Sequence, residues 1–162
     1  MYTLEYEKMS ELLKHYEVKL YNKDGIVNWN LPKDIEKKIG LEDFDYFFLA
    51  SSKEEKHGTR HAHLSLYPTK YDKVYLIEVK VPQIIPDLLG KVLKLLKKEM
   101  NCDILTSTGF CTGEKLTDCH FGVFFSATKI IDKKALIQGI KELENVEDVR
   151  IFSHTCEGCE EE

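Results

Sequence analysis

The chain has 162 residues, of which 43% are hydrophobic, with only nine glycines and four prolines, so wholesale disorder is excluded and one domain or two small ones are expected. The net charge of −5 argues against a strongly basic nucleic-acid module. No run of about 18 apolar residues is present, and the N-terminus lacks the apolar segment of a signal peptide. These features predict a cytoplasmic protein with no membrane partner.

Residues 1–17 are predicted to form an N-terminal amphipathic helix. Met9, Leu12, Leu13 and Tyr16 recur at the i, i+3, i+4, i+7 spacing of one helix face, among Glu and Lys. Two interpretations stand at this stage: a helix that binds a partner or dimerises, and a helix that only covers the core.

Residues 18–72 are predicted to form a small, β-rich α+β domain. Asp24-Gly25 is typical of a tight hairpin turn, and Pro32 and Gly40 are typical of a helix start and stop. The predicted elements are strands at 18–21, 26–30, 44–50 and 61–67, a helix at 33–39, a charged loop at 51–60 and a linker at 68–72.

Residues 73–154 carry a cleaner pattern of strands and helices. Asp132 is a predicted helix N-cap. Strands are predicted at 74–81, 103–109, 120–128 and 146–153, with helices at 88–100 and from 132 to about 143, before a Cys- and Glu-rich tail at 155–162. The order β-α-β-β-α-β is that of ferredoxin-like folds, so the predicted fold class is α+β with a ferredoxin-like C-terminal domain.

This C-terminal half resembles the ACT domain, an effector-binding module of many amino-acid-metabolism enzymes and regulators. The residues that carry the resemblance are the strand at 74–81, the segment Pro86-Asp87-Leu88-Leu89-Gly90 and the Leu-rich helix after it, with further similarity at 101–108 and 143–149. The family usually has Pro where this chain has Leu89. The resemblance implies an amino-acid effector at this turn, often across a dimer interface.

The ligand residues that the resemblance implies are Pro86, Asp87, Leu88, Leu89 and Gly90, with Ser107 and Thr108 as polar partners. Physical chemistry supports the turn independently, because Gly90 lets the backbone approach a ligand and the first N–H groups of a helix suit a carboxylate. Asp87 would repel that carboxylate and suits an amino group. The alternative is that Gly90 only permits close packing of helix on sheet.

The segment from Asn28 to Leu41, with its Leu31-Pro32 pair and its short helix ending at Ile39-Gly40, resembles the AbrB-type swapped-hairpin domain. The family often has Gly-Arg where this chain has Gly25-Ile26. The resemblance implies a dimer, and it implies DNA binding as a transcription regulator as one use of the fold. The candidate phosphate contacts are Lys23, Lys33, Lys37, Lys38 and Arg60. A solvated helix face explains the lysines equally well.

Five cysteines in a chain without an export signal make a disulfide framework a poor interpretation. Cys156 and Cys159 form one Cys-x-x-Cys pair, a weak zinc signal. The topology is expected to bring the hairpin cysteines close to the exit of the last strand, so the candidate zinc ligands are Cys111, Cys119, His154, Cys156 and Cys159. Alternatively, Cys111 and Cys119 are a cross-strand pair. His57, His61 and His63 are a second, weaker metal candidate.

No catalytic motif is present, so the chain is predicted not to be an enzyme, and no cofactor other than zinc is suggested. The first hypothesis is a ligand-responsive regulator, homodimeric or a higher homo-oligomer, that senses an amino acid or similar small effector and controls transcription. The alternative is a small-molecule or zinc-binding protein without DNA contact.

Overall fold

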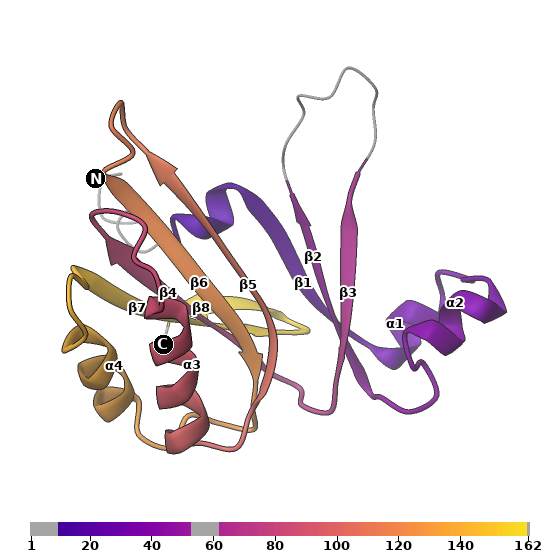
Figure 1. Ribbon diagram of the computed structural model, residues 1–162. Coiled ribbons are helices and arrows are strands. Elements are labelled where there is room, and N and C mark those ends of the chain that lie inside the picture. The colour runs from indigo at the N-terminus through magenta and orange to yellow at the C-terminus, as the bar shows by residue number, and fades with distance from the viewer. Residues whose placement is uncertain (1–9, 53–61, 162) are drawn as a thin grey trace, which may run out of the picture.

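The computed structural model describes residues 10–52 and 62–161. It is a mixed α+β structure with two antiparallel sheets (Figure 1). The smaller sheet contains, in this order, β1 (Tyr16–Asn22), β2 (Tyr46–Ser52) and β3 (Leu64–Thr69). Among the described helices, none is long and apolar enough to cross a membrane.

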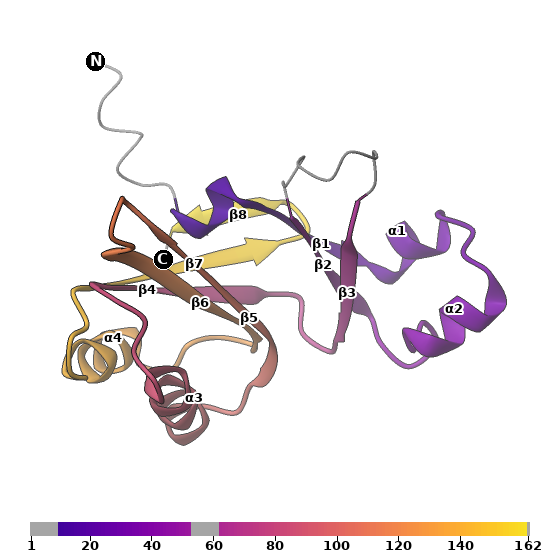
Figure 2. The same ribbon diagram turned by 45° about the horizontal axis from the view of Figure 1, so that its top comes forward.

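The larger sheet has five strands in the order β5-β6-β4-β7-β8, and every neighbouring pair is antiparallel. Two helices, α3 (Leu88–Glu99) and α4 (Lys133–Lys141), cover one of its faces (Figure 2). The strands are β4 (Val74–Val81), β5 (Asp103–Thr112), β6 (Asp118–Ser126), β7 (Asp148–Thr155) and β8 (Gly158–Glu161).

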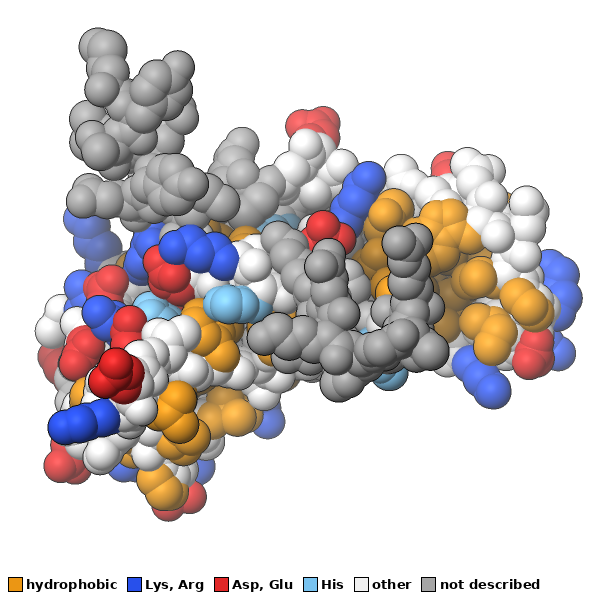
Figure 3. All heavy atoms as spheres, turned by 90° about the horizontal axis from the view of Figure 1, so that it is seen from above, with side chains coloured by type: hydrophobic (Ala, Val, Ile, Leu, Met, Phe, Trp, Pro, Cys, Tyr) orange, Lys and Arg blue, Asp and Glu red, His pale blue; other side chains and the backbone are white. Residues whose placement is uncertain are grey.

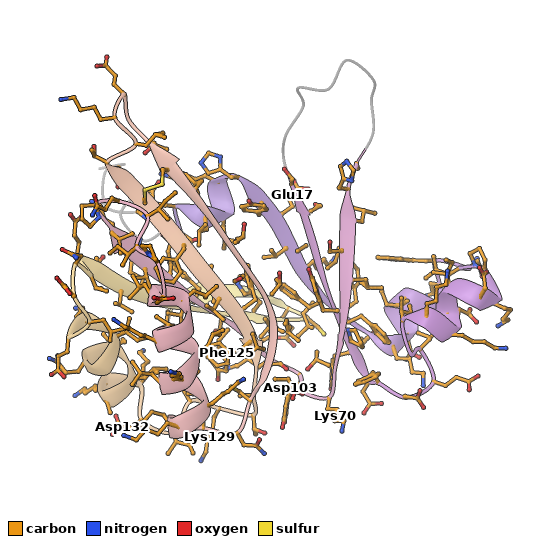
Figure 4. All side chains as sticks on the ribbon, viewed as in Figure 1. Glu17, Lys70, Asp103, Phe125, Lys129 and Asp132 are labelled. Carbon is orange, nitrogen blue, oxygen red and sulfur yellow. A yellow bond between two sulfur atoms is a disulfide. The ribbon has the colours of Figure 1, made fainter. Side chains whose placement is uncertain are left out.

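The helix-covered face of the larger sheet forms the main core. Val92 and Leu96 of α3 are buried, as their helical spacing in the sequence predicts, and Leu88 is buried with them. Leu89, also expected on this face, is exposed instead. The carboxylate of Asp132 accepts a hydrogen bond from the backbone N–H of Ala135, at 3.0 Å, which confirms the predicted cap of α4 (Figure 4). The predicted strands and helices of this half are therefore confirmed, with shifts of a few residues at their ends.

The opposite face of the larger sheet packs against the smaller sheet. Leu20 of β1 and Phe48 of β2 meet Leu76, Phe124 and Phe152 in one buried cluster. The ring centroids of Phe48 and Phe124 are 5.0 Å apart. The two halves that the sequence separates at residue 72 thus share a hydrophobic core.

The N-terminal helix expected over 1–17 differs from the structure where the chain is described; residues 1–9 lie outside the described part. A single 3-10 turn, η2 (Leu12–Lys14), is followed by β1 from Tyr16. Leu12 is fully buried against the larger sheet. The pairing of β1 with β2 thus outweighs the helical spacing of the apolar residues.

The hairpin predicted around Asp24-Gly25 is wrong, and so is the strand predicted at 26–30. The segment instead forms a helix, α1 (Lys23–Val27), because Asn22 caps it by accepting a hydrogen bond from the backbone N–H of Gly25 at 2.9 Å. Ile26 is fully buried with Phe47 and Leu41 on the outer face of the smaller sheet. The same Asn and Gly residues suit a turn and a helix cap, and the burial of Ile26 favours the cap.

The helix after Pro32 is confirmed as α2 (Lys33–Lys38), and Gly40 ends it with φ +69°. The predicted strands at 44–50 and 61–67 correspond to β2 and β3. The first two residues of the loop predicted at 51–60 belong to β2, and residues 53–61 lie outside the described part. The predicted linker at 68–72 begins inside β3. The tail after residue 154 is part of a β7-β8 hairpin rather than an unstructured extension.

Two glycines give a matched test of packing. A Cβ on Gly122 would clash with the side chain of Leu12 and lie 2.6 Å from Cδ1 of Leu76, whereas a Cβ on Gly90 would meet no atom within 4 Å. We expect Gly122→Ala to lower the free energy of unfolding by about 1–3 kcal/mol. Gly90→Ala should raise it by about 0.5 kcal/mol, because alanine favours helix. Urea denaturation measures both, and a neutral Gly122→Ala would contradict the packing of Leu12.

Candidate functional site

An open, mainly apolar pocket of about 560 Å³ lies between the start of α3 and the β5-β6 hairpin. Its volume is within the range of small-molecule sites, roughly 300–1,000 Å³. The lining residues come from the end of β4 and the chain after it, from β5, and from the start of β6: Val81, Ile84, Ile85, Leu88, Leu89, Ser107, Thr108, Gly109, Phe110, Cys111, Leu116, Cys119, His120 and Phe121.

The backbone shapes this pocket at two places. Asp87 has φ +66°, a left-handed conformation that turns the chain from the β4 exit into α3. Gly109 lies opposite Phe121 in the sheet, and a Cβ there would come within 3.0 Å of the carbonyl oxygen of His120. A glycine is therefore needed at this position for β5 to lie close to β6 along the pocket.

The pocket includes four of the seven predicted ligand residues. Leu88 and Leu89 line it from α3, and Ser107 and Thr108 line it from β5. Pro86, Asp87 and Gly90 are exposed beside it and are not part of the lining. Gly90 does not serve helix–sheet packing, because no atom lies within 4 Å of its would-be Cβ. The side chain of Asp87 makes no cap hydrogen bond to the first turn of α3.

The apolar rim of the pocket and the histidine in its lining were not predicted from the sequence. Ile84 is 78% exposed and Leu116 is 59% exposed, although both are large apolar residues. Apolar residues in loops, at Ile84-Ile85 and at Leu116, were the available signal. His120 is 8% exposed and stacks on Phe110, with ring centroids 5.5 Å apart.

Figure 3 shows further apolar side chains exposed at the α1 and α2 end of the molecule.

A buried group of polar side chains connects this pocket with η2. Nδ1 of His120 lies 3.6 Å from Oε1 of Glu78, and Nε2 lies 3.2 Å from Oδ1 of Asp118. Glu78, 3% exposed on β4, accepts hydrogen bonds from the hydroxyl of Ser10 and from the backbone N–H groups of Glu11 and Leu12. The carboxylate of Glu78 therefore satisfies the start of the 3-10 turn.

The pocket offers apolar surface and a few polar groups to a ligand. The oxygens of Glu78 accept from Ser10 and the turn, and the hydroxyl oxygen of Ser10 accepts from the backbone N–H of Leu13. Both ring nitrogens of His120 face carboxylates. An apolar ligand would gain affinity here from burial, while Ser107, which is on the face of β5 that α3 covers, can offer its hydroxyl to a polar end.

The structure does not gather the five predicted zinc ligands. Cys111 and Cys119 are opposite each other on β5 and β6 and are joined in a disulfide, which confirms the alternative of a cross-strand pair and makes them unavailable as the predicted zinc ligands (Figure 4). Cys119 pairs in register with Val81 at one end of β4, and His154 pairs with Val74 at the other end, about 23 Å away. The hairpin lies where β6 begins, whereas β7, parallel to β6, exits at the opposite end.

Cys156 and Cys159 lie near His154 in the chain, and His154 pairs in register with Cys159 of β8. Within the described residues, no group of three or more His, Cys, Asp or Glu side chains has the arrangement of a metal site. His57 and His61 lie outside the described part, and His63 is exposed before β3.

His154 is buried between the two sheets, 3% exposed, with its ring 6.2 Å from that of Phe48 and 6.1 Å from that of Phe124. Its Nε2 has no hydrogen-bond partner in the described part of the chain. Burial lowers the pKa of His154 from 6.5 to about 4. The folded protein therefore holds this imidazole in its neutral form.

The candidate DNA contacts lie at the far end of the molecule. Lys33, Lys37 and Lys38 are on α2, and Lys23 is on α1. Lys33 pairs with Glu36 at 2.8 Å, and this contact raises the pKa of Lys33. The side chain of Lys23 donates to the carbonyl oxygen of Glu42. Arg60 lies outside the described residues, so DNA binding stays a prediction.

Neither comparison with known proteins identifies a relative. No protein-family model matches the chain, and a search of curated proteins finds no match. The case for a function therefore depends on the geometry of the pocket.

The buried His154 predicts how stability changes with pH. The folded-state pKa is about 4 and the unfolded one is about 6.5, so between these values the unfolded chain binds a proton that the folded chain does not. The contribution of His154 to the free energy of unfolding is therefore fully present above pH 6.5. It is lost as the pH falls to about 4, which lowers that free energy by about 3 kcal/mol. In the His154→Leu variant, the urea concentration at the midpoint of unfolding should change less between pH 6.5 and about 4 than it does in the wild-type protein.

The control is His63→Gln, which replaces an exposed imidazole and leaves His154 in place. It should keep the wild-type slope. An unchanged slope in His154→Leu would show that His154 is not the group that titrates in this window.

Proposed function

We propose that the chain is a ligand-responsive regulatory protein whose pocket beside α3 binds a small effector with an apolar body. The observation that carries the proposal is the pocket itself, which is lined by apolar side chains and includes four of the residues expected from the sequence. Such a pocket is the default binding-site hypothesis for an uncharacterised protein.

We propose further that β4 to β7 form a ferredoxin-like domain of the ACT type. Support comes from the order β4-α3-β5-β6-α4-β7, from the sheet order β5-β6-β4-β7, and from the two helices on one face. Two features go beyond that pattern: β8 extends the sheet, and the smaller sheet covers the second face.

The lining favours an amino acid with an apolar side chain, or a molecule of similar size and polarity. Val81, Ile85 and Leu88 can take up an aliphatic or aromatic body, and the first turn of α3, which has no side-chain cap, can accept a carboxylate. The exposed carboxylate of Asp87 stands at the same turn and suits an ammonium group. A strongly charged side chain would lose its hydration here without a partner.

The buried group around Glu78 supports a regulatory role. His120 belongs to the pocket lining, and Glu78 holds the turn that leads into β1. A ligand that prefers one position of His120 would favour the arrangement of the two sheets that goes with that position. The size of this shift in the equilibrium is set by the difference in the ligand's affinity for the two arrangements. Homodimerisation and control of transcription are part of this proposal.

Two equally exposed isoleucines provide the test. Ile84 is 78% exposed at the pocket rim, and Ile131 is 72% exposed in the connection before α4. Binding is measured by calorimetry with leucine, phenylalanine, lysine and glutamate, and with the neutral apolar dye N-phenylnaphthylamine. We expect the apolar amino acids and the dye to bind, and Ile84→Glu to weaken binding about tenfold, since the new charge must be desolvated.

Ile131→Glu should leave affinity within about twofold, because a substitution at an exposed site away from the pocket changes little. If neither the dye nor any of the amino acids binds the wild-type protein, the proposed function is wrong. Equal losses in the two variants would place binding elsewhere.

A further inference from the structure

The disulfide between Cys111 and Cys119 forms part of the pocket wall. The two residues are directly opposite in the β5-β6 register, with Cα atoms 4.1 Å apart, and both line the pocket. Cys111 is half-buried, whereas Cys119 is only 4% exposed. A molecule that enters the pocket therefore reaches the sulfur of Cys111 first.

The same disulfide closes the short loop that carries part of the rim. Leu116 lies in this loop, is 59% exposed, and has φ +52°, a conformation that residues other than glycine rarely adopt. Its carbonyl oxygen is 3.5 Å from Sγ of Cys119. The cross-link thus joins the two strands immediately beside the loop that places Leu116 over the pocket.

We propose that Cys111–Cys119 is a thiol-exchange site that controls the pocket, with a small thiol as the reacting partner. The inference rests on the proposed ligand-binding function of the same pocket. The thiolate of the partner attacks Sγ of Cys111, forming a new S–S bond as the Cys111–Cys119 bond breaks. Cys119 leaves as a thiolate and takes a proton from solvent, and its S–H can then donate to the carbonyl oxygen of Leu116.

A second molecule of the thiol completes the reduction. Its thiolate attacks the partner's sulfur in the mixed disulfide, so the partner is released as its symmetric disulfide and Cys111 leaves as a thiolate that is then protonated. Two thiols are oxidised and one protein disulfide is reduced, so two electrons and two protons pass to the protein. Reduction frees the 112–118 loop, and the pocket loses the fixed position of Leu116.

Two other cysteines are less suited to this exchange. Burial is the main cause that raises the pKa of Cys102 and of Cys156, so each has less of the reactive thiolate at neutral pH. The pocket lining also includes neither of them.

The test uses the full chain with Cys102, Cys156 and Cys159 replaced by serine, so that the disulfide pair alone remains. The oxidised protein is incubated with glutathione, and peptide mass spectrometry locates the adduct. We expect the adduct on Cys111, and we expect saturating N-phenylnaphthylamine to slow its formation several-fold, because the dye occupies the pocket. An adduct on Cys119 instead, no adduct on either cysteine, or no protection by bound dye would overturn the proposal.

Dye affinity gives an independent readout. Wild-type protein should bind N-phenylnaphthylamine several-fold more weakly after reduction, and Cys111→Ser/Cys119→Ser should match the reduced protein. Equal affinity in the two oxidation states of the wild-type protein overturns redox control whether or not the double variant folds. Failure of the dye and of all four amino acids to bind the oxidised protein instead overturns the proposed function, while adduct mapping still tests the exchange.

Discussion

The position of β4 in the middle of the structure determines where the other elements can lie. Seven of its eight residues are buried, and Lys80 is the exception. One face, with Ile77 and Val79, needs the apolar sides of α3 and α4, and the other, with Leu76, needs the smaller sheet. Because β4 is buried on both faces, apolar area is removed from water on each side of it. This burial is the main contribution of β4 to the stability of the fold.

One charged residue interrupts this apolar strand, and its surroundings explain why it is tolerated. Glu78 faces the side of the smaller sheet, where an unpaired carboxylate would be costly. The N–H groups at the start of η2 and the hydroxyl of Ser10 meet this need, and His120 lies beside it. The polar contact therefore specifies where the N-terminal turn docks, while Leu12 and Gly122 provide the apolar part of the same contact.

The C-terminal half could be predicted from sequence because its signals are local and agree with one another. The helical spacing in α3, the cap at Asp132 and the apolar alternation of the strands all point to the observed elements. The N-terminal half was harder, because its structure depends on distant residues. Asn22 and Gly25 are compatible with a hairpin or a cap, and only the burial of Ile26 against Phe47 decides between them.

The residues of the candidate site also divide into those that local sequence predicts and those that depend on contacts between distant segments. Leu88, Leu89, Ser107 and Thr108 could be named from the strand-to-helix turn, whereas Ile84, Leu116 and His120 join them only because β6 brings the hairpin beside the loop after β4. The direction of β6 also explains why the predicted zinc ligands do not lie close together. A strand that begins beside Val81 must end beside Val74, so the hairpin cysteines and His154 lie at opposite ends of β4. The Val81 end holds the pocket beside α3, while at the Val74 end the neutral His154 is buried beside Phe48. The pocket beside α3 and the packing of the two sheets around His154 thus lie at opposite ends of a single strand.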